Sequence, residues 1–170
     1  MERNPLSTPN RTRFPSRVAI SDENRVRLVE TCNVALGSTL DLASQVKQAH
    51  WNIKGPQFFA RHQLFDEIAT HLREHADNLA ERAATLGGYA EGTARLAIER
   101  SVLPEYDLDA VDGRQHIRTL AERYGKYAKM MRDSIDVAKS VDDAATEDLF
   151  TEVLRATELD MWFLESHVSV

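Results

Sequence analysis

From Ser21 to the end of the chain, apolar residues recur at helical spacing, and only short breaks interrupt the pattern. Glycine, proline and turn-forming acidic residues mark these breaks, because such residues end helices. They are Gly55-Pro56, Gly87-Gly88 and Val141-Asp142-Asp143. No segment alternates apolar and polar residues as a strand does. The sequence therefore predicts an all-α protein.

The breaks divide the chain into four long helices. We expect the first over 22–52 and the second from Pro56, in its first turn, to about residue 86. The third should begin between 108 and 112 and end before 141, and the fourth should span about 145–167. Residues 89–107 form a long connection, with a short helix expected near 93–99. Two helical hairpins joined by one long crossover predict a four-helix bundle.

The chain of 170 residues is one domain, with 42% hydrophobic and 28% charged residues. No apolar run approaches the roughly 20 residues that span a bilayer, and the start has no apolar signal-peptide region. The single cysteine, Cys32, fits the reducing cytoplasm. It lies in an apolar stripe, so we interpret it as a small core residue rather than a reactive thiol.

The net charge of −6 argues against a body that is itself a basic nucleic-acid binder, but the charge is uneven. We expect residues 1–20 to form a flexible basic arm before the bundle of 21–170, because the segment is rich in proline and arginine and poor in apolar periodicity. The arm either contacts DNA phosphates or is a plain disordered tail. Its candidate DNA contacts are Arg3, Arg11, Arg13 and Arg17.

Two pairs of potential metal ligands lie on the predicted second helix. His62 and Asp66 are one turn apart, as are Asp77 and Glu81, and His50 precedes His62 by twelve residues. At about 100° per residue the four share one face, beside the apolar face, so we expect them to point outward. At about 1.5 Å per residue the pairs lie roughly 16 to 22 Å apart, too far to share one metal ion. An antiparallel second copy would bring them together, which predicts metal sites between two chains.

Segment 47–88 reads KQAHWNIKGPQFFARHQLFDEIATHLREHADNLAERAATLGG. It resembles the signature of the Dps family, the miniferritins or DNA-binding proteins from starved cells. The matching elements are KQAHWN, the Gly-Pro entry to the second helix, His62 with Asp66, and Asp77-x-x-x-Glu81-Arg82 before a glycine pair. Helix order and length extend the resemblance from about residue 21 to the end. It implies a ferritin-like bundle, a homo-oligomeric hollow shell of twelve subunits, and a ferroxidase centre at each two-fold interface.

The same resemblance implies the ligands of each centre: His50, His62 and Asp66 from one chain, with Asp77 and Glu81 from the other. The implied reaction is oxidation of Fe²⁺, preferably by hydrogen peroxide rather than oxygen. Ferric oxyhydroxide then accumulates in the shell, and DNA is protected from oxidative damage. Imidazoles and carboxylates suit Fe²⁺ and accept Zn²⁺ or Mn²⁺. No thiolate is present for an oxidant to destroy.

Other residues carry secondary hypotheses. Trp51, next to His50, is either an electron donor for stray oxidants or simple interface packing, and Trp162 is a weaker donor candidate. Asp142 and Asp143 either belong to an acidic cluster that begins the last helix or contribute to an iron entry at a three-fold axis.

Four further histidines stay outside the predicted centre. His71 and His75 fall off the ligand arc and are given structural or surface roles, and His116 and His167 receive none.

Three functions remain open at this point. The first is a ferroxidase and iron store. The second is a nucleoid-associated protein that compacts DNA through the arginine arm, with oxidation secondary. The third treats the sites as zinc depots.

Overall fold

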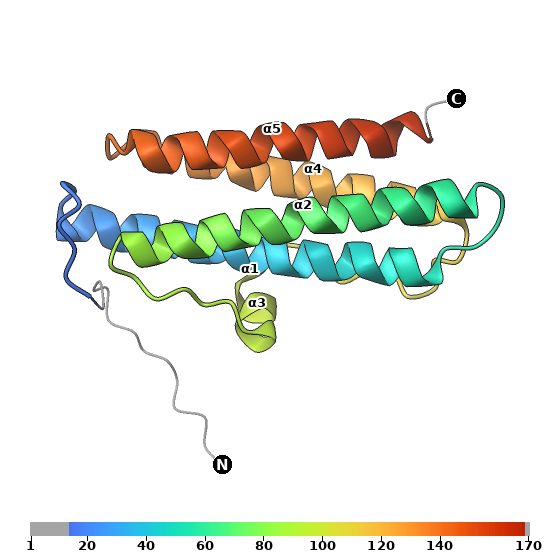
Figure 1. The fold of residues 1–170 in the computed structure, drawn as a ribbon, viewed down its shortest axis with the longest axis horizontal. Helices are drawn as coiled ribbons and strands as arrows, with labels where there is room; N and C mark the ends of the chain where they lie inside the picture. The colour runs from blue at the N-terminus through green and yellow to red at the C-terminus, as the bar shows by residue number, and fades with distance from the viewer. Residues whose placement is uncertain (1–13, 169–170) are drawn as a thin grey trace, which may run out of the picture.

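The computed structural model describes residues 14–168, which form five helices (Figure 1). They are α1 (Asp22–Asn52), α2 (Phe58–Thr85), α3 (Ala94–Arg100), α4 (Gly113–Lys139) and α5 (Ala144–Ser166). Within 14–168 there is no strand, only an isolated bridge between Lys54 and Asp112. No helix in that range is long and apolar enough to cross a membrane. The all-α prediction is confirmed.

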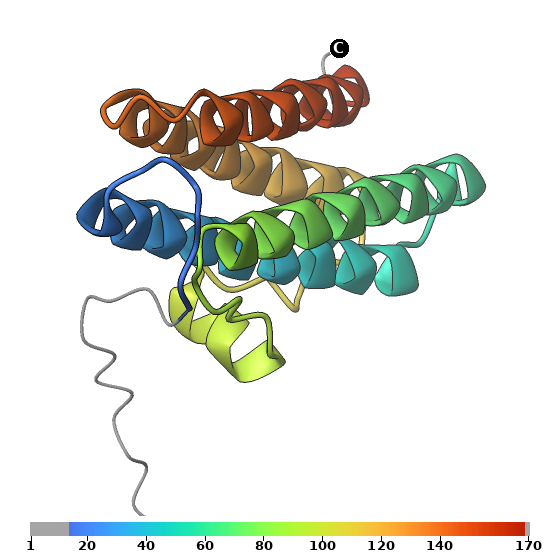
Figure 2. The same cartoon turned by 60° about the vertical axis from the view of Figure 1, so that its left-hand side comes forward.

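The four long helices pack as two hairpins, α1 with α2 and α4 with α5 (Figure 1). A long crossover joins α2 to α4, and the short helix α3 within it lies outside the bundle against α1 (Figure 2). Gly37 permits this close approach, because a Cβ there would stand 2.6 Å from the Cβ of Arg100. The predicted bundle with a long crossover and a short extra helix is therefore confirmed.

Local sequence signals explain most helix ends. Thr93 and Asp143 each cap the helix that follows with a side-chain oxygen. Asp112 caps α4 and forms a capping box with Gln115. Gly87 has φ +83°, a conformation that favours glycine, and it follows the last turn of α2. The observed ends lie within one or two residues of the predicted ones.

The start of α2 differs from the prediction. Pro56 lies before the helix rather than in its first turn, because Gly55 (φ +95°) and Gln57 (φ +65°) both adopt left-handed conformations. The backbone N–H of Phe58 donates to the Gly55 carbonyl at 3.1 Å and closes a turn ahead of the helix. The hairpin therefore turns on a tight loop between α1 and α2.

One core runs through the bundle. Its largest fully buried side chains include Phe65 of α2, Tyr124 and Tyr127 of α4, and Phe150 of α5. Cys32 is fully buried among them, as predicted for a core residue. Aromatic groups of this size supply much of the apolar area that stabilises such a fold.

Residues 14–20 differ from the predicted flexible arm. The N–H of Phe14 donates to the Gly87 carbonyl at 3.0 Å, and the Ser16 hydroxyl donates to the Thr85 carbonyl at 3.2 Å. Val18 packs partly buried against the core. The segment is thus fastened to the end of α2. Of the predicted DNA contacts, Arg17 is exposed, and the other three lie outside the described residues.

Candidate metal centre

His50 and His62 face each other across the α1–α2 hairpin. His50 lies in the last turn of α1 and His62 in the second turn of α2. The Nδ1–H of His50 donates to the His62 carbonyl at 2.9 Å, and the Nδ1–H of His62 donates to the His50 carbonyl at 3.0 Å. Their rings stack with centroids 3.7 Å apart. Because a carbonyl only accepts, Nδ1 of each neutral ring carries the hydrogen, and Nε2 keeps the lone pair that a metal ion needs.

Asp66 lies one turn beyond His62 and is half exposed. Its carboxylate accepts a hydrogen bond from the Lys47 ammonium at 2.7 Å. This bond and the charge of Lys47 hold the pKa of the Asp66 carboxyl below its usual range, against a smaller effect of desolvation. The carboxylate is therefore ionised at neutral pH, and in the single chain its partner is Lys47.

Asp77 and Glu81 are exposed on the same helix, further toward its C-terminal end. From Asp66 to Asp77 the helix rises about 16 Å. Asp77 borders an open groove of about 460 Å³ between α1, α2 and the start of the crossover. Small apolar residues such as Ala76, Ala80 and Ala90 line the groove. A neighbouring helix can therefore approach this half of the ligand set closely.

The single chain does not complete a site. Among residues 14–168, no three His, Cys, Asp or Glu side chains lie so that together they could hold a metal ion. The structure brings His50, His62 and Asp66 to one end of the hairpin and leaves Asp77 and Glu81 apart from them. Any site that uses all five needs ligands from a second chain.

Large apolar side chains surround the histidine half of this ligand set. Trp51 is 65% exposed and Phe59 70% exposed, and the Phe58 ring lies 5.1 Å from the His62 ring, centroid to centroid. The Lys47 ammonium stands 5.8 Å over the Trp51 ring. Such a patch of exposed aromatic surface is typical of a protein interface. Trp162, the weaker donor candidate, is also exposed, on α5.

Asp142 and Asp143 have different surroundings. Asp142 is exposed and has φ +56°. Asp143 is buried and caps α5, and its carboxylate accepts two hydrogen bonds from Arg82, at 2.7 and 3.0 Å. This carboxylate is directed inward to Arg82, so the structure does not support the predicted iron-entry role for Asp143. The alternative role at the start of the helix accounts for its position.

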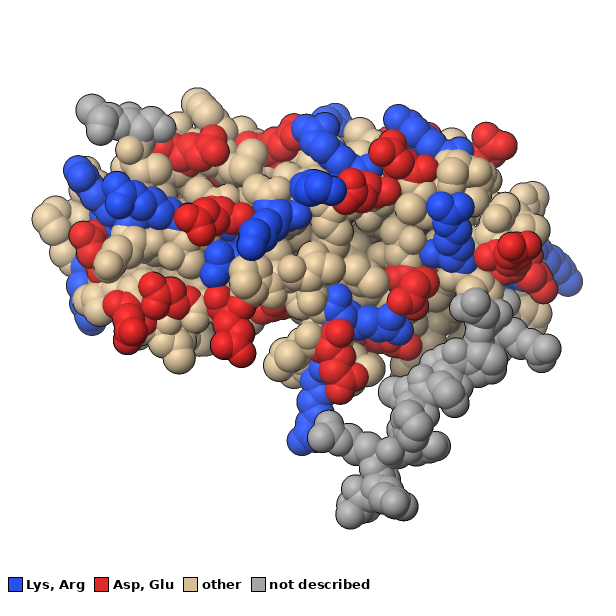
Figure 3. Space-filling view, turned by 180° about the vertical axis from the view of Figure 1, so that it is seen from behind, with Lys and Arg blue, Asp and Glu red and all other residues tan. Residues whose placement is uncertain are grey.

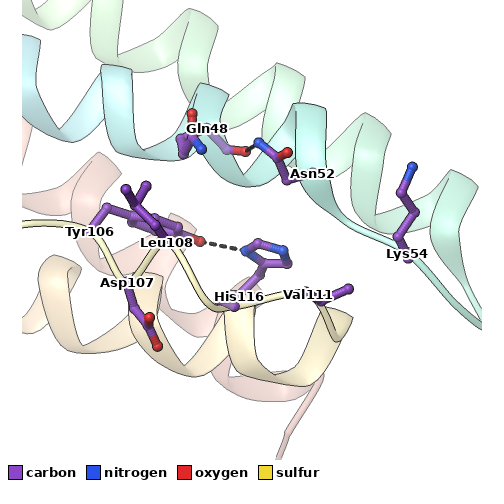
Figure 4. Close-up of a pocket in the computed structure, with 9 residues that line it drawn as sticks. Gln48, Asn52, Lys54, Tyr106, Asp107, Leu108, Val111 and His116 are labelled. Carbon is purple, nitrogen blue, oxygen red and sulfur yellow. Dashed lines mark hydrogen bonds between the residues drawn. The ribbon is translucent and has the colours of Figure 1, made fainter.

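Sequence reasoning missed one charged side chain and one cavity. The first is Lys47, which a helical spacing of three residues from His50 could have flagged. The second is a cavity of about 210 Å³ between the end of α1 and the start of α4, where Tyr106 and His116 meet (Figure 4). No local signal links Tyr106 to His116, because the crossover brings them together.

His71 and His75, predicted to be structural or surface residues, belong to α2, and His71 contacts α5. Nδ1 of His71 is 3.2 Å from a carboxylate oxygen of the buried Asp160. His75 is buried. Both positions suit the structural half of that prediction.

Comparisons with known proteins agree with the observed fold. Residues 30–170 match the ferritin-like domain family. The chain is 43% identical over 136 residues to a DNA protection during starvation protein of Agrobacterium fabrum, covering 80% of this chain and 84% of that protein.

Solved structures agree as well. DpsA14 from Streptomyces coelicolor superimposes with a TM-score of 0.90 at 31% identity, covering 95% of this chain and 96% of that one. A Dps protein from Vibrio cholerae, described as a member of a broad superfamily of ferritin-like diiron-carboxylate proteins, superimposes at 0.81 with 27% identity, covering 86% and 91%.

Proposed function

This chain belongs to the Dps family of ferritin-like proteins, and from that membership we propose that it is a ferroxidase and iron store. It oxidises Fe²⁺ at centres shared by two subunits and stores the ferric product in a hollow shell. The family likeness to diiron-carboxylate proteins supports iron as the metal.

The observation that carries this proposal is the division of the ligand set along α2. His50, His62 and Asp66 lie at one end of the hairpin, and two exposed carboxylates lie about 16 Å further along the helix. Two copies of α2 packed antiparallel around a two-fold axis would bring each half opposite its complement and create two equivalent centres. The exposed aromatic patch beside the histidines and the small-residue groove beside Asp77 support such an interface.

Each ligand would have a distinct task. The two imidazoles would bind through Nε2, held in orientation by their backbone hydrogen bonds. The carboxylates of Asp66, Asp77 and Glu81 would stabilise the ferric product better than the ferrous substrate, because oxygen anions favour the higher charge. Two ferrous ions would give one electron each to one peroxide molecule, which avoids release of a hydroxyl radical.

Subunit mixing tests the shared centre. One subunit type carries His50→Ala and His62→Ala, and the other carries Asp77→Ala and Glu81→Ala. In a mixed pair one centre is doubly broken and the other is intact. Random mixing at equal amounts makes half of the pairs mixed, so about one quarter of the parent ferroxidase activity should return.

A matched control mixes the histidine-deficient subunit with one carrying Asp66→Ala. Both defects lie in the same half, so no centre becomes intact and no activity should return. Mass spectrometry of tagged subunits verifies that mixed shells have formed. Equal activity in the two mixtures, or none in either, would overturn the shared-centre assignment. Parallel measurements with peroxide and with oxygen test the proposed preference for peroxide.

A second candidate function is DNA compaction through the basic arm, and the names of relatives support it. Basic and acidic side chains are interspersed on the face shown in Figure 3, so the body of the protein offers phosphates no continuous basic surface on that side. Relatives are named for DNA protection during starvation. The arginine-rich N-terminal segment is therefore the element proposed to bind DNA, without sequence preference.

Deletion of residues 1–13 tests this second function better than a longer deletion, because Phe14 and Ser16 are fastened to α2. The deletion should abolish DNA retardation at low salt and leave the Fe²⁺ oxidation rate unchanged. Retardation that survives the deletion would contradict the role of the arm.

Other expectations stay predictions: a shell of twelve subunits, a cytoplasmic location, Trp51 as an electron donor, and Asp142 at an iron entry. Zinc or manganese at the same centres is also untested. Iron turnover that depends on peroxide would count against the zinc-depot hypothesis.

A further inference from the structure

We propose that Tyr106 and His116 form a proton-coupled electron donor. Tyr106 gives one electron to an oxidising radical that enters the cavity beside it, and its phenolic proton moves to Nδ1 of His116. This radical-quenching activity goes beyond the proposed ferroxidase, and its test requires no iron.

The two side chains are already arranged for proton transfer. The Tyr106 hydroxyl lies 2.6 Å from Nδ1 of His116, and the two ring planes are inclined by only 14° (Figure 4). Tyr106 comes from the crossover, and His116 comes from the first turns of α4. A separation of 2.6 Å is at the short end for a hydrogen bond with an O–H donor, so the proton needs to move only a short way.

The direction of the hydrogen bond follows from the burial of both groups. Burial raises the pKa of the Tyr106 hydroxyl, with a smaller contribution from Asp107 against the opposing charge of Arg123. Burial lowers the pKa of the His116 imidazole. At neutral pH the phenol is therefore protonated and the imidazole neutral, so the O–H donates and Nδ1 accepts.

Three groups near His116 partly offset the cost that burial imposes on a transient positive charge. Against the dominant effect of burial, Asp112, Asp107 and the Asn52 backbone act to raise the pKa of the ring. Asn52 ends α1, whose C-terminal carbonyls carry partial negative charge.

The cavity gives small oxidants access to the pair. Its volume of about 210 Å³ compares with about 30 Å³ for one water molecule in the liquid, so a radical of that size fits with solvent. Leu108 and Val111 line it and are themselves exposed, at 77% and 58%. Lys54 also borders the cavity, from the segment after α1 (Figure 4). The phenol is thus sheltered but reachable.

The two fully buried tyrosines provide a contrast within the same bundle. The Tyr124 hydroxyl has no hydrogen-bond partner among the described residues, and the Tyr127 hydroxyl meets the Thr39 hydroxyl at 2.6 Å. Neither has a base to receive its proton, because a threonine hydroxyl is not basic. One-electron oxidation of a phenol without proton loss is much less favourable, so Tyr106 is the better donor.

The step balances in atoms and charge. The electron leaves the Tyr106 phenol, its O–H bond breaks, and an N–H bond forms at Nδ1 of His116. A hydroxyl radical, as the oxidant, takes up the electron and leaves as a hydroxide ion, whose negative charge balances the positive charge gained by His116. A one-electron reductant such as ferrous ion then restores the phenol, and His116 returns the proton.

The experiment uses the metal-free, assembled protein with Trp51 and Trp162 both replaced by phenylalanine, so that no indole competes. Azide radicals generated by pulse radiolysis oxidise the remaining aromatic residues, and optical and electron paramagnetic resonance signals report the tyrosyl radical. Tyr106→Phe in this background should remove most of the long-lived signal. Tyr89→Phe, the matched surface control, should leave most of it. Equal long-lived signal in Tyr106→Phe and its parent would overturn the proposal.

A second measurement separates proton transfer from packing. In the parent, oxidation of Tyr106 should show a deuterium isotope effect and little dependence on pH near neutrality. His116→Gln should slow it about 100-fold, the usual scale for a positioned base, and make the rate rise with pH. Oxidation of His116→Gln at the parent rate would contradict the proton transfer. If that variant does not fold, the deuterium isotope effect in the parent shows whether the proton moves together with the electron. Absence of an isotope effect would overturn the proposal.

Discussion

The ion pair between Arg82 and Asp143 should contribute strongly to stability, and replacement of Asp143 tests this. The pair joins the last turns of α2 to the start of α5, and its side chains are only 15% and 6% exposed. Nε of Arg82 also donates to the Thr146 hydroxyl at 2.8 Å. The Asp143 carboxylate in turn accepts from Thr146 and caps α5. Its removal would leave a buried guanidinium without its anion.

The magnitude follows from these contacts. Breaking a buried ion pair by removing one partner costs about 3 to 5 kcal/mol. Loss of a helix cap costs about 1 kcal/mol. We therefore expect Asp143→Ala to lower the free energy of unfolding by about 4 to 6 kcal/mol, whereas Asp143→Asn, which keeps an acceptor, should lose about 2 to 3 kcal/mol. Arg82→Met combined with Asp143→Ala should be less destabilised than Asp143→Ala alone, because no unpaired charge remains.

Urea unfolding at one fixed protein concentration measures these differences, so that concentration affects every variant equally. Asp142→Asn is the matched control. This substitution changes the neighbouring exposed carboxylate, and asparagine tolerates the backbone φ of +56° at this position. It should shift the free energy of unfolding by no more than about 0.5 kcal/mol. A loss below about 1 kcal/mol for Asp143→Ala would refute the reasoning. If the proposed function holds, iron uptake per folded Asp143→Asn protein should equal that of the parent.

The pH dependence has a defined sign. Burial opposes ionisation of Asp143, but hydrogen bonds from Thr146 and Arg82 outweigh it and hold the pKa of the carboxyl below its usual value. The stabilisation that the ionised Asp143 carboxylate contributes is therefore complete above its pKa in the unfolded chain, about 3.9. It is lost as pH falls through the lower pKa of the folded state. The stability gap between the parent and Asp143→Asn should narrow in that acidic range.

Two further predictions concern single positions. Gly125→Ala should stabilise α4 by about 0.5 to 1 kcal/mol, because the added Cβ meets open space. Gly37→Ala should destabilise the protein by about 1 to 3 kcal/mol, because the added Cβ pushes α3 away from α1. Urea midpoints equal to that of the parent would contradict both expectations. Burial raises the pKa of the Asp160 carboxyl, against an opposing effect of His71, so Asp160→Asn should raise Tm at pH 8 and lose this gain in acid, where the parent carboxyl is protonated. A lower Tm at pH 8 would contradict this reasoning.

The helices could be predicted because residues close in sequence determine where each helix begins and ends. A glycine pair ends α2, and Asp112 with Gln115 begins α4 within a few residues of sequence. Pro56 misled the prediction, because proline suits both the first turn of a helix and a tight turn. The left-handed conformation of Gln57 places Pro56 in the tight turn before the helix. That choice depends on how α1 packs against α2, which no short window of sequence contains.

The candidate centre could be predicted only in part from the sequence. Spacing alone placed Asp77 and Glu81 on one exposed face, and the structure confirms their exposure. The competing contact of Lys47 with Asp66 spans 19 residues, and the Arg82–Asp143 pair spans 61. Such contacts arise from the packing of hairpins, so the sequence predicted Asp143 at a helix start or an iron entry but not its buried ion pair with Arg82.

The buried thiol of Cys32 can report on opening of the folded protein. Desolvation raises the pKa of this thiol to about 12, with a smaller opposing effect of Arg82, so an alkylating reagent finds almost no thiolate while the bundle is closed. Every modified molecule must therefore have opened first. The labelling rate then measures how often the folded protein opens, without denaturant and without an introduced probe.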